Sequence, residues 1–420
     1  MIKKYFSLVI ISFSILVLLF TIFKAEIIFE GKKMYYYKYY YFTSFSLIIF
    51  SILTIFLSEK IKQYMLIVGL SILSVLYIYE YFLSSAAYKK ITEISRTTVY
   101  EKLIKESDKR VSLTIGPGNY LKDKLDLYPL SGMSNSLTIH CNENGYMSMY
   151  DSDRYGFNNP DEEWDKSSIK FLLTGDSFTG GACVNRPHDI ASVLRKKTSE
   201  GSITLGYGGN APLIEYAALK EYVNKNVNIE NIVWLFTEGN DVEGLYHELD
   251  NEILIKYVLD DKFTQNLINK QDQVDQIVKN YISNKRHELN QRRTHEEESL
   301  KNKTKLFFKL YYLRNSIIKP TAGNDLKNIL ELANKFSIEN NSKFSLVYLP
   351  AMERYSGIYY RDANYNALKS MTSDLGINFI DVHKNIFQKE KDPLLLFSKF
   401  GHYTIEGYEK IANLILKRTN

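Results

Sequence analysis

Three apolar runs, uncharged except near their ends, open the chain at residues 5–23, 39–57 and 64–82. At about 1.5 Å of rise per residue, a helix of roughly 19 residues approaches the thickness of a bilayer's hydrocarbon core. Tyrosines gather at 35–41 and 77–81, as expected of an aromatic belt at a membrane interface. The pattern predicts three transmembrane helices within a membrane region, residues 1–83.

From residue 166 onward, short apolar runs alternate with helix-like stretches. The runs, rich in β-branched residues, are Ile169–Leu173, Ile203–Leu205, Ile232–Phe236, Phe344–Leu349 and Ile377–Ile380. The helical stretches are His188–Ser199, Pro212–Asn226, Asn324–Ile338, Ala363–Leu375 and Ile405–Lys417. Short apolar runs are typical of strands buried on both faces. The alternation predicts a three-layer α/β/α domain over residues 166–420 with a five-stranded parallel sheet.

Two segments depart from this rhythm. Residues 84–165 are broken by Pro, Gly and Asn and hold no persistent period, which predicts a linker or small cap. Residues 245–319 are rich in Lys, Asn, Gln, Glu and Arg, with weak helical spacing. We expect a charged helical insertion there, either a lid over a site or a solvated helical hairpin.

Composition excludes several function classes. The 53 basic and 48 acidic residues are interleaved, so the net charge of +5 does not form a nucleic-acid footprint. The two cysteines, Cys141 and Cys183, form no C-x-x-C pair, which argues against a zinc site or a disulfide scaffold. The sequence does not decide whether Cys141 and Cys183 form a single disulfide bond. We expect neither a metal nor a cofactor.

Polar and small residues follow several predicted strands. Gly175-Asp176-Ser177 follows the first, Gly206–Asn210 the second and Thr237–Asp241 the third, while His402 precedes the last helix. Because the carboxyl ends of parallel strands meet at one edge of a sheet, these residues should converge where such folds bind ligands.

These groups are the ones that acyl transfer requires. Ser177 would attack a carbonyl carbon, and His402 would accept its proton. The Gly209 N–H, the Asn240 side chain and the Ser177 amide would stabilise the oxyanion.

The order of the four blocks, with Gly407-Tyr408 after the histidine, resembles the SGNH (GDSL-type) hydrolase family over about residues 166–420. That resemblance implies a flavodoxin-like fold, with Ser177, Gly209, Asn240 and His402 in the roles just given. Residues 154–159, Arg-Tyr-Gly-Phe-Asn-Asn, look like the lead-in of membrane-anchored members from bacterial surface-polysaccharide systems. Those members are mostly esterases or O-acyltransferases that act on glycans.

The chain departs from the family at one position. The family usually places an aspartate two or three residues before its histidine, where this chain has Lys399 and Phe400. A Ser–His dyad, or an acid from elsewhere in the fold, must then be assumed. The candidate acids are Asp381, Asp392 and Glu406, and His383 is a rival base.

The sequence thus predicts a membrane-anchored serine esterase or O-acyltransferase of the SGNH type. Its substrate would be an acyl ester, such as an acetyl ester, of a cell-surface glycan or a lipid-linked saccharide. One alternative is a catalytically inactive SGNH-like module of a polysaccharide assembly system. Another is a dinucleotide-binding protein, because residues 206–211 fit the pattern G-x-G-x-x-A between a strand and a helix.

We expect a multi-pass protein of the cell (inner) membrane. The sequence does not decide on which side of the membrane the large domain lies. The family resemblance favours the extracytoplasmic side. The basic residues near the spans number four on the amino-terminal side and seven on the other: Lys3, Lys4, Lys60 and Lys62 against Lys24, Lys32, Lys33, Lys38, Lys89, Lys90 and Arg96. By the positive-inside rule this count favours the cytoplasm.

Overall fold

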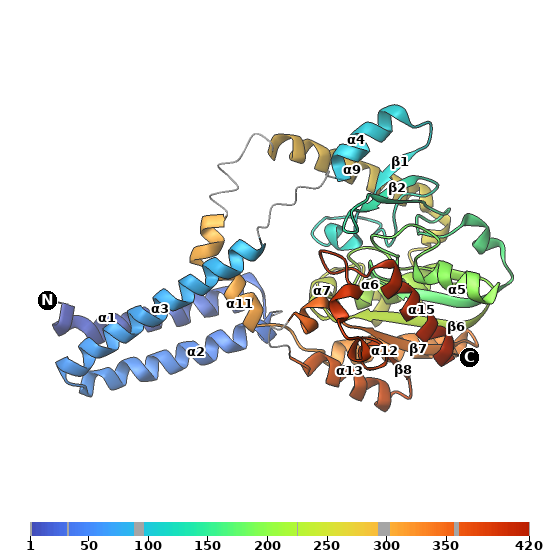
Figure 1. The fold of residues 1–420 in the computed structure, drawn as a ribbon. Helices are drawn as coiled ribbons and strands as arrows, with labels where there is room; N and C mark the ends of the chain where they lie inside the picture. The colour runs from blue at the N-terminus through green and yellow to red at the C-terminus, as the bar shows by residue number, and fades with distance from the viewer. Residues whose placement is uncertain are drawn as a thin grey trace. The chain divides into compact units, whose positions relative to one another are not determined.

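The computed structural model describes residues 2–31, 33–87, 96–224, 226–292, 303–356 and 361–419. The chain divides into two compact units. The helical unit comprises Met1–Thr92 and Gln291–Pro320, and the α/β unit comprises Glu93–Asn290 and Thr321–Asn420. Figure 1 shows the elements of each.

Three long helices form most of the helical unit: α1 (Ile2–Ile22), α2 (Met34–Leu53) and α3 (Glu59–Ala87). The candidate spans that overlap them, Tyr5–Ile28, Tyr36–Phe56 and Glu59–Ser84, run for 24, 21 and 26 residues and are long and apolar enough to cross a membrane. Most of their large apolar side chains are exposed, as a lipid-facing surface requires. Small polar groups join α1 to α2, because the Thr21 and Ser44 hydroxyl oxygens lie 3.5 Å apart. The predicted transmembrane segments are therefore confirmed as helices of spanning length.

A later part of the chain belongs to this same unit. Helix α11 (Tyr311–Ile317) packs against α3. The buried Glu80 carboxylate on α3 accepts hydrogen bonds from the backbone N–H groups of Tyr312 (3.0 Å) and Leu313 (2.7 Å). The predicted insertion, residues 245–319, is therefore divided between the two units.

A five-stranded parallel sheet forms the centre of the α/β unit. Its strands are β4 (Ser168–Gly175), β5 (Ser202–Thr204), β6 (Asn228–Thr237), β7 (Lys343–Leu349) and β8 (Asn378–Asp381). They lie in the order β5-β4-β6-β7-β8, and every neighbouring pair is parallel. Counted along the chain this order is 2-1-3-4-5, that of flavodoxin-like folds. The predicted fold class is confirmed.

Helices cover both faces of the sheet because its strands are apolar on both sides. On β6, Ile232, Trp234 and Phe236 face one core, and Val233 and Leu235 face the other. The first core is covered by α6 (Pro212–Tyr222), α12 (Asn324–Glu339) and α13 (Ala363–Asp374), and the second by α5 (Ile190–Thr198) and α15 (Ile405–Thr419). Short helices α7 (Asp241–Glu248), α8 (Lys256–Leu259) and α14 (Val382–Asn385) complete the unit.

The segment predicted as a linker or small cap contains regular structure. It holds α4 (Arg96–Glu106) and a second, mixed sheet of β1 (Val111–Leu113), β2 (Leu137–Cys141) and β3 (Ser148–Asp151). Buried residues of this segment, such as Ile139 and Phe157, belong to the same core as one face of the large sheet. Its strands are only three to five residues long, too short to show the alternation of apolar and polar residues that marks a strand in a sequence.

Part of the insertion also belongs to this core. Tyr257 on α8 and Val274 and Val278 on α9 (Gln271–Arg292) are fully buried in it. This part of the insertion is therefore not a solvated helical hairpin. Residues 293–302 of the predicted insertion lie outside the described residues.

Candidate active site

Strand β4 ends in a turn that only glycine can begin. Gly175 has φ +153°, and a Cβ there would lie 2.1 Å from Thr179 Oγ1 and 2.7 Å from the Leu235 carbonyl oxygen. The turn carries the chain through the buried Asp176 to Ser177 at the carboxyl edge of the sheet. A parallel sheet of this type presents ligand-binding groups at this edge.

His402 reaches Ser177 from the loop before α15. Ser177 Oγ lies 2.9 Å from His402 Nε2, although 225 residues separate the two in the chain. The loop is closed by hydrogen bonds between the Ser398 N–H and the His402 carbonyl (2.6 Å) and by a bridge between Phe397 and Tyr403. The Phe178 ring packs against the imidazole, with ring centroids 4.7 Å apart. The structure therefore brings the predicted serine and histidine together.

The carboxylate that meets the histidine is Glu143, which the sequence analysis missed. Glu143 Oε1 lies 2.8 Å from His402 Nδ1, and Oε2 accepts hydrogen bonds from the Ser398 hydroxyl (2.6 Å) and the His402 N–H (3.3 Å). Burial acts to raise the pKa of Glu143, but the hydrogen bonds and charge of His402, with the Ser398 bond, outweigh it and hold that pKa below its usual value. Since an ionised carboxylate only accepts, Nδ1 carries the proton and Nε2 is free to accept from Ser177.

A disulfide fixes the segment that carries Glu143. Cys141, at the end of β2, is bonded to the buried Cys183 in the loop after Ser177, with the two Cα atoms 4.8 Å apart. The Asn144 side chain adds a hydrogen bond to the Cys183 carbonyl (2.9 Å). Residues on both sides of Glu143 are thus tied to the loop that holds the serine.

The three carboxylates that we expected as candidate acids, Asp381, Asp392 and Glu406, do not contact His402. Their partners lie elsewhere: Tyr365 for Asp381 (2.6 Å), the Leu394 N–H for Asp392 (3.1 Å) and Lys410 for Glu406 (2.9 Å). The acid instead comes from the residues between β2 and β3 of the small sheet, a segment with no periodic signal in the sequence.

The rival base His383 also lies away from the serine. Its Nδ1 is 2.6 Å from the Tyr355 hydroxyl, and its Nε2 is 3.1 Å from the Gln388 amide nitrogen. Both ring nitrogens therefore have protein partners within a buried structural cluster.

Two backbone N–H groups at the serine end of the cavity have no acceptor within the described chain. Neither the Ser177 N–H nor the Gly209 N–H donates to an acceptor in the described chain. Gly209 has φ +81°, which favours glycine, and a Cβ on the adjacent Gly208 would lie 3.9 Å from Ser177 Cβ. Gly208 and Gly209 line the same cavity as Ser177, so the glycine-rich loop that fits a dinucleotide pattern faces the serine.

Asn240, the other predicted oxyanion donor, is held by the residue next to the serine. Its side-chain nitrogen donates to Asp176 Oδ2 (3.1 Å), and Asp176 Oδ1 accepts from the Thr237 hydroxyl (3.1 Å) and the Phe178 N–H (3.0 Å). Burial is the main cause that raises the pKa of Asp176. Asn240 is exposed at the start of α7 but does not line the cavity. One N–H of its amide remains for a ligand.

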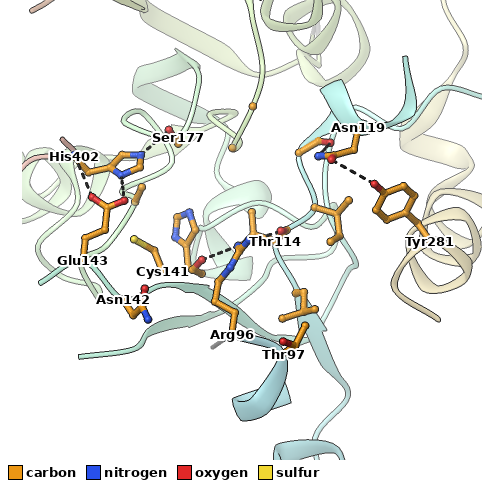
Figure 2. A pocket seen from close by; sticks show the side chains of 17 residues that line it. Arg96, Thr97, Thr114, Asn119, Cys141, Asn142, Glu143, Ser177, Tyr281 and His402 are labelled. Carbon is orange, nitrogen blue, oxygen red and sulfur yellow. Dashed lines mark hydrogen bonds and ion pairs between the residues drawn. The ribbon is translucent and has the colours of Figure 1, made fainter. Parts of the chain in front are cut away.

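A cavity of about 610 Å³ opens in front of the serine (Figure 2). Its walls come from the two sheet edges, α4 and α9. Besides Ser177, His402 and Glu143, its polar lining comprises Arg96, Thr97, Thr114, Asn119, His140, Asn142 and Tyr281. This volume lies in the usual range of small-molecule sites.

Four potential metal ligands cluster at the same place. One ligand atom from each of Cys141, Glu143, Cys183 and His402 lies within 4.8 Å of the others. The disulfide removes both thiolates from this set, and Glu143 and His402 bond to each other. The donor chemistry present therefore suits proton transfer and not metal binding.

No family model and no curated protein matches the chain. Among solved structures, an acetyl xylan esterase, AlAXEase, is similar at 13% identity and a TM-score of 0.36, over 59% of this chain and 98% of that one. A putative lipolytic protein of the G-D-S-L family from Desulfitobacterium hafniense DCB-2 has the same identity and coverage and a TM-score of 0.33. The strand order defines the fold of the α/β unit as flavodoxin-like.

Proposed function

We propose that this chain is a membrane-anchored serine esterase or acyltransferase that acts on an acyl ester of a glycan. The observation that carries the proposal is the unbroken chain of contacts from Ser177 through His402 to Glu143 at the edge of a cavity. Serine, imidazole and carboxylate in this arrangement generate a nucleophile at neutral pH.

In this proposal each residue has one step. Ser177 Oγ attacks the ester carbonyl as His402 Nε2 takes its proton, and the Glu143 carboxylate stabilises the imidazolium that forms. The Ser177 and Gly209 amides stabilise the oxyanion, and Asn240 holds Asp176, the residue before the nucleophile. His402 then returns the proton to the departing alcohol, which leaves an acyl-serine. Water or an acceptor hydroxyl, deprotonated by the same imidazole, completes hydrolysis or transfer.

The size and lining of the cavity support a glycan ester. A volume of about 610 Å³ exceeds what an acetyl group alone would fill. Amide and hydroxyl groups of Asn119, Asn142 and Tyr281 line the cavity, and such groups bind sugar hydroxyls. The reason for considering an inactive module was the absence of an acid beside His402, and Glu143 supplies one.

The disulfide supports an extracytoplasmic α/β unit. Disulfides persist in oxidising compartments and are rare in the cytosol. This outweighs the basic-residue count of four against seven, a narrow margin for a chain with three spans. The amino terminus and the loop between the second and third spans would then face the cytoplasm.

Turnover of a small acetyl ester by the full chain in detergent tests the proposal. Ser177→Ala and His402→Ala should each abolish turnover, while His383→Ala should retain it. Full activity in either of the first two variants would refute the assignment. The His383 variant is the control, because His383 is the rival base and only His402 contacts the serine.

A further inference from the structure

A cation is fixed in the cavity wall beside the triad. Arg96, the first residue of α4, uses one guanidinium nitrogen, Nη1, to donate to the carbonyl oxygens of His140 (3.0 Å) and Thr114 (3.4 Å). Those carbonyls belong to β2 and to the residue after β1, so the small sheet sets the position of the guanidinium. Nε and Nη2 have no acceptor among the described residues.

The same cation has no counter-ion among the described residues. No carboxylate there lies within ion-pair distance of Arg96. Glu143 is the acidic residue that lines the cavity, and both of its oxygens are already engaged by His402 and Ser398. A guanidinium that backbone carbonyls hold at a cavity wall, with no carboxylate partner among the described residues, is suited to bind an anion.

A second group in this wall also lacks a partner. His140 lines the cavity and is only 6% exposed, and its Nδ1 has no hydrogen-bond partner among the described residues. Burial, with smaller effects from the His402 and Arg96 charges, lowers the pKa of His140 to about 3. His140 is therefore neutral at pH 7 and adds no positive charge that could replace Arg96 as the anion's partner.

We propose that Arg96 and His140 form a subsite for an anionic group on the glycan ester whose acyl bond Ser177 attacks. This inference rests on the proposed function, and it narrows the substrate class to acidic saccharides. In the view of Figure 2, the triad lies to the left, the Asn119–Tyr281 pair to the right and Arg96 between them. A sugar chain bound across the cavity would therefore pass the guanidinium.

The free edge of a guanidinium matches two kinds of anion. Nε and Nη2 present parallel N–H donors that fit a carboxylate or a phosphate in two-point contact. The carboxylate would come from an acidic sugar, and the phosphate from a phosphorylated or lipid-linked saccharide. The two sources share this recognition chemistry, and binding experiments can separate them.

Calorimetric titration of the full-length Ser177→Ala chain in detergent tests the subsite without requiring turnover. The ligands are trigalacturonate for the carboxylate, glucose 1-phosphate for the phosphate and maltotriose as the neutral control. We expect at least one anion to bind about tenfold more tightly than maltotriose at low salt, with this preference lost at high salt. Whichever anion shows the preference identifies the source.

Substitutions at two cations of α4 complete the experiment. Arg96→Ala should remove the preference, and Arg96→Lys should retain part of it, since lysine keeps the charge but not the two-point geometry. Lys102→Ala, at an exposed lysine on the same helix, is the matched control and should keep the preference. Equal binding of all three ligands, or a preference that persists in Arg96→Ala, would overturn the subsite. If the unmodified chain does not turn over the ester at all, the proposed function is overturned instead.

Discussion

His402 donates a hydrogen bond to Glu143 across 259 residues of sequence, at a distance of 2.8 Å. The histidine lies beside the large parallel sheet, and the glutamate follows β2 of the small one. The three active-site side chains are therefore complete only when the small sheet is folded against the large one. The segment before the first strand of the large sheet supplies one of the three side chains of the candidate site.

Glu143→Gln should lower kcat for an acetyl ester by roughly 10³- to 10⁴-fold with little change in fold. The amide can no longer stabilise an imidazolium, and its NH₂ group favours the wrong histidine tautomer. Steady-state kinetics on the full chain measures this. Glu406→Gln, which removes the charge of a carboxylate paired with Lys410, should stay near the parent rate. A Glu143 variant as active as that control would show that a Ser–His dyad suffices.

The sequence predicted the large sheet well because its strands are apolar runs buried on both faces. Each predicted strand overlaps an observed one, and the residues after the strands converge as expected for parallel order. Ser177 and His402 were found for this reason. Glu143 was not predicted, because β1–β3 are short and β1 pairs with a segment distant in sequence. Their residues therefore show no alternation of apolar and polar positions. The closeness of Cys141 to Glu143 in sequence was the one signal available.

Reduction of the Cys141–Cys183 disulfide should destabilise the α/β unit and slow turnover. The two cysteines are 42 residues apart, so breaking the disulfide raises the conformational entropy of the unfolded chain. This lowers the free energy of unfolding by up to about 4 kcal/mol. Because Glu143 follows Cys141 by two residues, kcat should fall more than KM rises. Melting temperature and kinetics with and without dithiothreitol measure both effects.

The Cys141→Ser/Cys183→Ser double variant provides the control for reduction. It should match the reduced parent and show no response to dithiothreitol. If the reduced parent keeps its full kcat, the disulfide does not position Glu143.

The buried His140 should make the α/β unit less stable in acid. Its pKa is about 3 when folded and 6.5 when unfolded, so the unfolded chain binds the extra proton as the pH falls below 6.5. This contribution to stability is present above pH 6.5 and is lost progressively towards pH 3. Between pH 7 and pH 5 the free energy of unfolding should decrease by about 2 kcal/mol from this residue.

Denaturant unfolding of His140→Gln at several pH values isolates the contribution of His140 to the pH dependence of stability. The variant should show a shallower decrease in stability between pH 7 and pH 5 than the parent. His188→Gln, at an exposed histidine, should follow the parent curve. Parallel curves for the parent and the His140 variant would contradict the buried, neutral state of His140.

Cysteine labelling should place the α/β unit outside the cytoplasm. In cells or spheroplasts, a membrane-impermeant maleimide should label Glu339→Cys, at an exposed position on α12. It should leave Ser58→Cys, between the second and third spans, unlabelled until the membrane is opened. The reverse pattern would place the catalytic unit in the cytoplasm, as the count of basic residues suggests.

Covalent labelling by a fluorophosphonate tests the central claim most directly, since it reports an activated serine without knowledge of the natural substrate. The folded full-length chain should be modified at Ser177, as identified by mass spectrometry of its peptides. Labelling should disappear in Ser177→Ala and slow strongly in His402→Ala and Glu143→Gln. A folded chain that takes up no label, or takes it up equally well without His402, would contradict the account.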